Sequence, residues 1–162
     1  MLKCGITGHS GILGSQLIKK KFNFKFIIFK ENICNKKKIY QWIRKNKLDL
    51  IFHIAAIVPT RVVENNFSYA NNVNYIGTKN LVDAIVENNL NLQWFFFSST
   101  SHVYSLPKKK IKINEKFKKK AISKYGLTKL KAERYIKKKL SKSKIPYCIG
   151  RIFSFTHINQ ED

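Results

Sequence analysis

The sequence lacks long apolar runs, paired cysteines and acidic charge. None of its apolar runs approaches the about 18 to 20 residues that span a bilayer, and no apolar leader with a small-residue cleavage site opens the chain, so we expect a soluble, cytoplasmic protein without membrane contact. The cysteines, Cys4, Cys34 and Cys148, form neither a C-x-x-C pair nor a metal-ligand spacing. We therefore predict reduced, mostly buried thiols and no metal site.

Acidic residues are scarce, because the 162 residues include 9 Asp and Glu against 32 Lys and Arg, a formal net charge of +23. Such a charge attracts polyphosphate at low salt. Arginine, whose planar guanidinium suits phosphate and base contacts, contributes only Arg44, Arg61, Arg134 and Arg151. Lysine supplies the rest, which favours a solvated surface over a nucleic-acid partner. Salt-sensitive nucleic-acid binding through the lysines stays a competing hypothesis.

Apolar surface is abundant, since 44% of the residues are hydrophobic and 13% are aromatic. Five short apolar runs, typical of buried strands, alternate with segments of helical periodicity. The runs cover residues 2–7, 24–29, 50–54, 94–98 and 147–153, and the helical segments cover residues 12–21, 36–46, 68–89 and 125–141. This alternation predicts one domain over residues 1–162 with a doubly wound parallel sheet, a Rossmann-like three-layer α/β/α fold. We expect the lysine-rich stretch 108–120 to be a solvated loop.

A glycine-rich segment lies between the first strand and the first helix, where residues 7–14 read TGHSGILG. Gly8 can take a tight turn, Gly11 lets the backbone approach a pyrophosphate, and Gly14 lets the helix pack closely on the strand. The N-terminus of the helix then offers unpaired N–H groups and the positive end of its dipole to an anion. The segment therefore predicts a dinucleotide-binding turn.

A second candidate feature is the pair Tyr125 and Lys129, which stand at i and i+4 and project from one face of a helix. A tyrosine with a pKa of about 10 is a poor base at neutral pH, and a nearby ammonium favours its phenolate. We expect Lys129, together with an oxidised nicotinamide, to lower the pKa of Tyr125. Because the pair follows a strand that ends near Thr100, we predict that it is catalytic.

These features belong to a longer series of motifs. The others are residues 32–33 (NI), 49–56 (DLIFHIAA), 72–81 (NVNYIGTKNL), 97–104 (FSSTSHVY) and 125–133 (YGLTKLKAE). In this order and spacing they resemble the extended short-chain dehydrogenase/reductase family, the NAD-dependent nucleotide-sugar epimerases, dehydratases and reductases, which include the dTDP-4-dehydrorhamnose reductases. The resemblance covers nearly the whole chain.

The resemblance implies an NAD(P)-dependent oxidoreductase or epimerase that acts on a nucleoside-diphosphate sugar by hydride transfer. The short path between the second and third strands is similar to the reductases, and residues 97–104 are similar to the epimerases, so a 4-keto-sugar reductase and an epimerase both stay open. Thr100 occupies the Ser/Thr position of the family and is expected to hold the substrate oxygen. Tyr125 is expected to exchange a proton with that oxygen, and Lys129 to lower the pKa of Tyr125. The neighbours expected to be structural or to bond to backbone are Ser98, Ser99, Ser101 and His102.

The resemblance also implies the cofactor-binding positions. Lys30 aligns where an NAD-selective enzyme places a carboxylate, which slightly favours NADP over NAD, whereas a shift by one residue to Glu31 would reverse the preference. Asn32 replaces an aspartate that is common in the family. The cofactor-binding candidates are Gly8, Ser10, Gly11, Ile12, Leu13, Gly14, Lys30, Asn32, Ile33, Ala55, Ala56, Asn74, Tyr125 and Lys129.

The last segment, residues 151–155 (RIFSF), resembles the strand that leads into the C-terminal substrate domain of the family. Because the chain stops at Asp162, we expect that domain to be absent and the chain to be a truncated cofactor-binding portion. The alternative function is then a non-catalytic dinucleotide-binding module. The sequence leaves the oligomeric state open, with a homodimer as one candidate.

Overall fold

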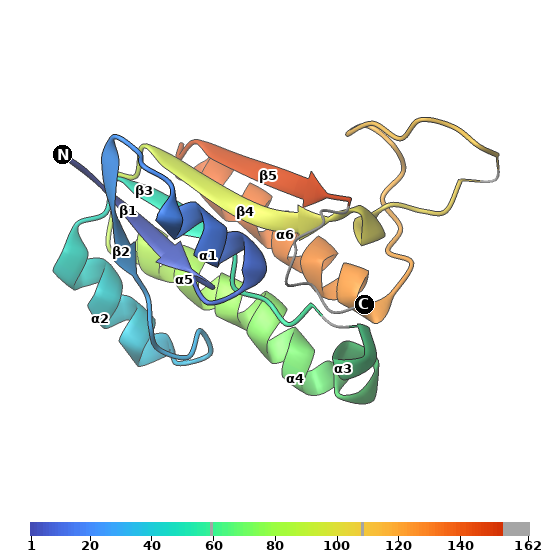
Figure 1. Cartoon of the computed structure of the whole chain (residues 1–162), viewed down its shortest axis with the longest axis horizontal. Helices are drawn as coiled ribbons and strands as arrows, with labels where there is room; N and C mark the ends of the chain where they lie inside the picture. Colours follow the sequence, from blue (N-terminus) through green and yellow to red (C-terminus); the bar gives the residue numbers. More distant parts are fainter. Residues whose placement is uncertain (59, 108, 154–162) are drawn as a thin grey trace.

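The computed structural model describes residues 1–58, 60–107 and 109–153, which form an α/β domain around one parallel sheet (Figure 1). The strand order is β2-β1-β3-β4-β5, and every neighbouring pair is parallel. The strands are β1 (Leu2–Thr7), β2 (Phe24–Ile28), β3 (Leu50–His53), β4 (Trp94–Thr100) and β5 (Tyr147–Ile152). All five predicted strands are present, and the predictions for Lys108, Ser154 and Phe155 lie outside the described residues.

Helices cover both faces of the sheet. On one face lies α1 (Ile12–Lys19), and on the other lie α2 (Lys36–Asn46), α5 (Thr78–Glu87) and α6 (Lys124–Lys142) (Figure 1). The predicted doubly wound, three-layer α/β/α arrangement is therefore confirmed. Each crossover from one parallel strand to the next carries at least one helix, as parallel pairing requires.

The main core lies between the sheet and the layer of α2, α5 and α6. Gly5 of β1 makes room for this layer, because a Cβ there would lie 2.5 Å from Leu48 Cδ1 and 2.6 Å from Trp42 Cη2. The buried residues of this core include Ile39, Ile43, Leu81, Ile85, Ile136 and Leu140 of the helices and Ile51, Phe95 and Phe97 of the sheet. This packing holds α6 beneath the carboxyl end of β4.

The prediction of one uninterrupted α-helix over residues 68–89 is wrong. This stretch is divided into α4 (Phe67–Asn71), a π-helical segment (Asn72–Gly77) and α5, and α3 (Thr60–Asn65) precedes it without having been predicted. The side-chain amide of Asn74, within the π-helical segment, accepts a hydrogen bond from the Ile57 N–H at 2.7 Å and donates to the Ile57 carbonyl at 2.9 Å. π-Helical turns inside α-helices often mark functional sites.

The cysteines are free thiols, as predicted, but only one of them is buried. Cys4 is buried and its pKa is raised to about 12 by desolvation, whereas Cys34 is half-buried and Cys148 is exposed. Across residues 1–58, 60–107 and 109–153, no helix combines the length and apolarity needed to cross a membrane. The same residues bring together no group of three or more His, Cys, Asp or Glu side chains that could hold a metal ion.

Candidate active site

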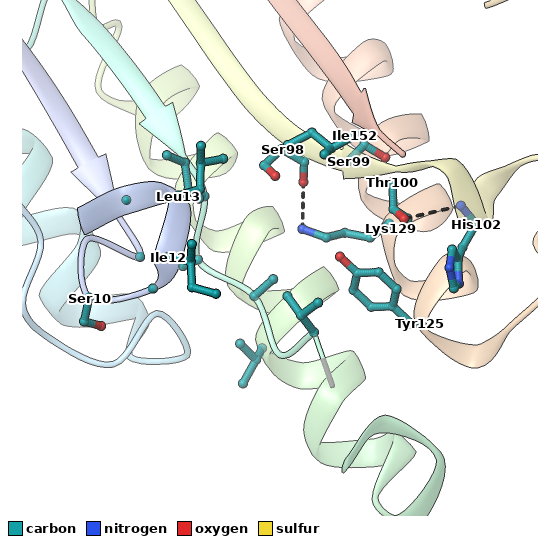
Figure 2. A pocket seen from close by; sticks show the side chains of 18 of the residues that line it. Ser10, Ile12, Leu13, Ser98, Ser99, Thr100, His102, Tyr125, Lys129 and Ile152 are labelled. Carbon is teal, nitrogen blue, oxygen red and sulfur yellow. Dashed lines mark hydrogen bonds between the residues drawn. The ribbon is translucent and has the colours of Figure 1, made fainter. Parts of the chain in front are cut away.

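A cavity of about 780 Å³ opens at the carboxyl ends of the strands (Figure 2). The glycine-rich turn after β1, the segment after β3, the end of β4 and the start of α6 form its walls. Ligands of open parallel sheets bind at this edge. The predicted site residues that line the cavity are Gly8, Ser10, Gly11, Ile12, Leu13, Gly14, Ala55, Ala56, Thr100, Tyr125 and Lys129.

The three glycines of the turn have different physical roles. Gly8 has a φ of 76°, a left-handed conformation, and a Cβ there would lie 2.5 Å from Ala55 N. A Cβ on Gly14 would lie 2.1 Å from Gly8 O. At Gly11 the nearest atom to a Cβ is Gly8 O at 3.7 Å, so the protein leaves space there. Gly8 and Gly14 are thus required by packing, whereas Gly11 leaves the turn open on the side of the cavity.

The N-terminus of α1 faces the cavity. Gly11 is its N-cap, and no side chain makes a capping hydrogen bond there. The next three residues, Ile12, Leu13 and Gly14, all line the cavity. The first backbone N–H groups of a helix have no partner within the helix, so this end can receive an anion.

Lys129 is buried on the wall opposite the turn (Figure 2). It is 1% exposed, its Nζ donates a hydrogen bond to the Ser98 carbonyl at 2.8 Å, and the same atom lies 4.6 Å from the centroid of the Phe97 ring. Burial lowers the pKa of Lys129 to about 7, and the Glu133 carboxylate opposes this shift. Lys129 is therefore a buried amine whose charge changes near neutral pH.

Tyr125 stands one helical turn before Lys129 and is 8% exposed. Burial raises the pKa of Tyr125 to about 12. This direction is opposite to the lowering expected from the i, i+4 pair, because desolvation disfavours the phenolate and the Lys129 ammonium does not offset it in the chain alone. A further positive charge or a hydrogen-bond donor in the cavity would lower the pKa of Tyr125.

Thr100 ends β4 beside Tyr125 and Lys129 (Figure 2). Its Oγ1 accepts a hydrogen bond from the His102 N–H at 3.3 Å, which leaves its hydroxyl hydrogen for another acceptor. His102 lines the cavity with its Nδ1 3.0 Å from Ser123 Oγ and its ring edge-on to the Tyr125 ring, contacts that suit the structural role expected for it. The expectation that Ser99 bonds to backbone is wrong, because its Oγ donates to the buried Glu133 carboxylate.

Four of the cofactor-binding candidates do not line the cavity. Lys30 is exposed after β2, and Asn32 Oδ1 accepts a hydrogen bond from the Cys34 N–H at 2.9 Å. Ile33 is 6% exposed, and a Cβ on Gly77 would lie 2.8 Å from its Cγ2. Asn74 is fully buried and, besides Ile57, its Nδ2 donates to Thr128 Oγ1 at 3.1 Å. Ligand contacts for these residues stay predictions.

A buried chain of hydrogen bonds, which sequence reasoning missed, joins the turn to the π-helical segment. His53 is fully buried at the end of β3, with Nδ1 2.7 Å from Thr7 Oγ1 and Nε2 2.7 Å from Thr78 Oγ1. Thr78 Oγ1 donates its hydrogen to the Asn74 carbonyl, so His53 Nε2 must carry the hydrogen and His53 Nδ1 must accept one from Thr7. The only signal in the sequence was a histidine within an otherwise apolar strand.

The burial of His53 in these hydrogen bonds predicts that the stability of the protein depends on pH. Burial first, and the nearby Lys129 charge second, lower the pKa of His53 to about 3. Because the unfolded histidine takes up a proton below pH ~6.5 while the folded one does not, the free energy of unfolding should fall by about 2 kcal/mol between pH 7 and pH 5. Urea denaturation across this range measures it. His53→Gln should remove the slope and His9→Gln should retain it; a slope unchanged in His53→Gln would contradict the assignment.

Comparisons with known proteins identify similar chains. A family model described as GDP-mannose 4,6 dehydratase matches residues 6–161. GDP-6-deoxy-D-talose 4-dehydrogenase from Aggregatibacter actinomycetemcomitans is 30% identical over an alignment of 144 residues that covers 85% of this chain and 48% of that protein. The chain therefore spans about half the length of this curated relative.

Two solved structures share the fold. The structure of dTDP-4-dehydrorhamnose reductase from Bacillus anthracis in complex with NADP superposes with a TM-score of 0.82 at 24% identity, over 94% of this chain and 54% of that one. The UDP-glucuronic acid 4-epimerase from Bacillus cereus, in complex with UDP-glucuronic acid and NAD, superposes with a TM-score of 0.79 at 24% identity, over 93% of this chain and 56% of that one.

Proposed function

The chain belongs to the GDP-mannose 4,6-dehydratase family, and from this premise we propose that it binds a nicotinamide dinucleotide and acts as an NAD(P)-dependent oxidoreductase or epimerase on a nucleoside-diphosphate sugar. The observation that carries the proposal is one cavity that joins the glycine-rich turn to Thr100, Tyr125 and Lys129. The names of the relatives support the substrate class, because GDP, dTDP and UDP sugars occur among them.

The residues of the cavity fit a dinucleotide. The open space beside Gly11 and the uncapped N-terminus of α1 suit a pyrophosphate, which needs close backbone approach and N–H donors. Ala55 and Ala56 present small side chains to the cavity at the end of β3. The cofactor, when bound, supplies or accepts the hydride.

The chain's own side chains supply the acid–base chemistry. Thr100 donates its free hydroxyl hydrogen to the reacting sugar oxygen and so orients it. Tyr125 gives a proton to that oxygen in reduction or takes one in oxidation. Lys129, held by the Ser98 carbonyl, has two further N–H groups and a charge that stabilises the phenolate of Tyr125.

The proposal is tested by incubating the protein with NADPH or NADH and GDP-, UDP- and dTDP-linked 4-keto sugars, and with NADP⁺ or NAD⁺ and the corresponding 4-hydroxy sugars. Nicotinamide absorbance reports hydride transfer, and chromatography reports epimer formation. Turnover of at least one nucleotide sugar is expected. Saturable cofactor binding without turnover would instead identify the non-catalytic dinucleotide-binding module, and absence of both would refute the proposal.

We also predict a preference for NADPH that depends on Lys30. Glu31, the residue that would favour NAD, is 3.5 Å from Lys38 Nζ in an exposed ion pair, whereas Lys30 is exposed without such a pair among the described residues. Replacing Lys30 with alanine should weaken NADPH binding about fivefold, the size of one exposed charge pair, and leave NADH binding unchanged. Lys25→Ala, on β2, is the matched control in fluorescence titrations. Equal losses for both cofactors would contradict the preference.

A further inference from the structure

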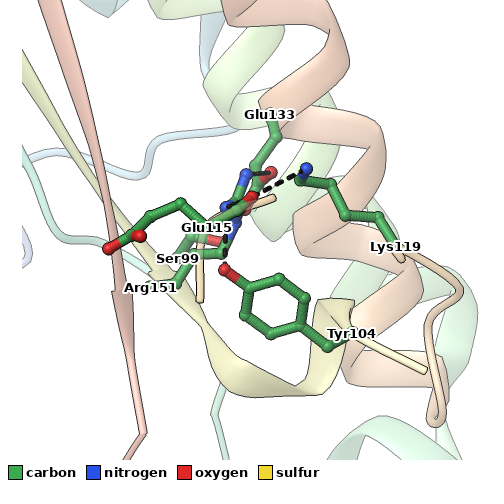
Figure 3. Close-up of polar contacts among 6 residues, drawn as sticks. All are labelled: Ser99, Tyr104, Glu115, Lys119, Glu133 and Arg151. Carbon is green, nitrogen blue, oxygen red and sulfur yellow. Dashed lines mark hydrogen bonds and ion pairs between the residues drawn. The ribbon is translucent and has the colours of Figure 1, made fainter. Parts of the chain in front are cut away.

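A second polar cluster lies behind the cavity wall and is centred on Glu133 of α6 (Figure 3). Glu133 is 4% exposed, and its carboxylate accepts three hydrogen bonds: from Ser99 Oγ at 2.5 Å, from Arg151 Nε at 2.9 Å and from Arg151 Nη2 at 2.8 Å. The pairing with Arg151 is bidentate, the geometry that fixes a guanidinium and a carboxylate most strongly. The cluster therefore ties α6 to the ends of β4 and β5.

Arg151 extends the cluster toward the loop after β4. Its Nη1 donates to the Tyr104 hydroxyl at 2.9 Å and to the Glu115 carbonyl at 3.5 Å, and its guanidinium carbon lies 5.2 Å from the centroid of the Tyr104 ring. Figure 3 shows the carboxylate, the guanidinium and the Tyr104 hydroxyl converging between the helix and the sheet. None of Glu133, Arg151 and Tyr104 lines the cavity, so these residues can act on the reaction only through others.

Members of this cluster adjoin two of the candidate catalytic residues, Lys129 and Thr100. Glu133 is one helical turn after Lys129, on the face of α6 that also carries Tyr125. Ser99 lies between Ser98, whose carbonyl receives the Lys129 hydrogen bond, and Thr100. A shift of Glu133 or Ser99 would therefore displace groups that hold Lys129 and Thr100 in place.

We propose that Glu133, held by Ser99 and Arg151, is a positioning residue that keeps the Lys129 ammonium charged and fixed beside Tyr125. The effect of Glu133 on catalysis rests on the proposed function, because Lys129 acts on Tyr125 only in the proposed reaction. The physical content of the proposal, an electrostatic link between Glu133 and Lys129, is independent of any substrate.

The charges around Lys129 support this role. Burial disfavours its ammonium and Glu133 is the group that opposes the effect. The other titratable groups near it are Tyr125 on its own helix and His53 from β3, which is neutral. Arg151 of β5 is paired with Glu133. Among the described residues no carboxylate lies within ion-pair distance of Lys129.

Replacing Glu133 should lower the pH at which Lys129 titrates. In Glu133→Gln the attraction is lost and Arg151 is left as an unpaired positive charge, so the titration midpoint of Lys129 should fall by at least about one pH unit. If Glu133 had only a packing role, loosening of the structure would hydrate Lys129 and raise its midpoint. The double variant Glu133→Gln with Arg151→Met removes both charges and should lower the midpoint by a smaller amount.

The experiment is a pH titration of lysine Cε signals in protein labelled with ¹³C-lysine, with Lys129 assigned from its absence in Lys129→Met. Glu64→Gln, which removes an exposed ion pair with Lys124, is the matched control and should leave the midpoint unchanged. A lower midpoint in Glu133→Gln supports the proposal; an unchanged or higher midpoint overturns it. If Glu133→Gln does not fold, the double variant decides by the same criterion.

This titration needs neither cofactor nor substrate. A failure of the proposed function would therefore leave the result on Glu133 intact, and an unchanged midpoint would remove the role of Glu133 without affecting dinucleotide binding. In an active protein the same variant should move the alkaline limb of the pH profile of kcat, where Lys129 loses its charge, by the same amount and in the same direction as the Lys129 midpoint.

Discussion

Replacing Tyr125 with phenylalanine is expected to lower the turnover of a nucleoside-diphosphate sugar by about 10²- to 10⁴-fold, the contribution of a positioned acid–base group. The substitution keeps the ring, which lies 5.9 Å from the His102 ring, and removes only the hydroxyl. Because the fold and the glycine-rich turn are untouched, the dissociation constants for NADPH and NADH should rise by no more than about tenfold, the effect of losing one hydrogen bond from a cofactor-binding candidate. Steady-state kinetics and fluorescence titration of the same preparation measure both quantities.

The matched control is Tyr69→Phe, which removes a hydroxyl from an exposed tyrosine of α4. It should leave both turnover and cofactor binding unchanged. Turnover that survives in Tyr125→Phe would exclude this residue as the proton donor and would direct attention to His102, the other titratable side chain of the cavity besides Lys129.

Replacing Gly14 with alanine is expected to weaken dinucleotide binding by about 100-fold or more, a loss of about 2.7 kcal/mol. The added Cβ would meet Gly8 O at 2.1 Å and His9 Cα at 2.8 Å, and both are backbone atoms that a rotamer change cannot move. The N-terminus of α1 must then separate from the turn. We also expect the free energy of unfolding to fall by about 1 to 3 kcal/mol, as in other overpacked sites.

Gly11→Ala separates ligand contact from packing in the same turn. Because the nearest atom to its Cβ is 3.7 Å away, the protein should keep its stability within about 0.5 kcal/mol. A pyrophosphate that approaches this backbone would still be obstructed, so affinity should fall by about tenfold. Denaturation curves and cofactor titrations of both variants test this contrast. Equal affinity in Gly11→Ala and the unmodified protein would exclude close approach at Gly11.

The parts of the fold that local patterns encode were predictable. The strands are continuous apolar runs, and α2 and α6 repeat their apolar residues at helical spacing, so both kinds of element leave a signal within about ten residues. The π-helical segment Asn72–Gly77 was not predictable, because the apolar period continues through it and the contact of Asn74 with Ile57 joins residues 17 positions apart. α3, with 6 residues, is too short to show a period.

The candidate site also combines features that the local sequence encodes with contacts that it does not encode. The glycine-rich turn and the i, i+4 pair are local, and the structure brings both to one cavity. The pairing of Thr7 with His53, 46 residues apart, and of Glu133 with Arg151, 18 residues apart, depends on which strands become neighbours. The expected lowering of the Tyr125 pKa did not follow from spacing, because burial of the phenol, which the sequence does not quantify, acts in the opposite direction.

The measurement that tests the central claim most directly is a titration of the unmodified protein with NADPH and NADH, followed by nicotinamide fluorescence and by backbone amide NMR. We predict saturable binding of one dinucleotide per chain, with the largest amide shifts at Gly8, Gly11 and Gly14 and at Lys129. Absence of saturation at millimolar cofactor, or shifts confined to the exposed lysines and abolished by moderate salt, would contradict a dinucleotide site at this edge of the sheet.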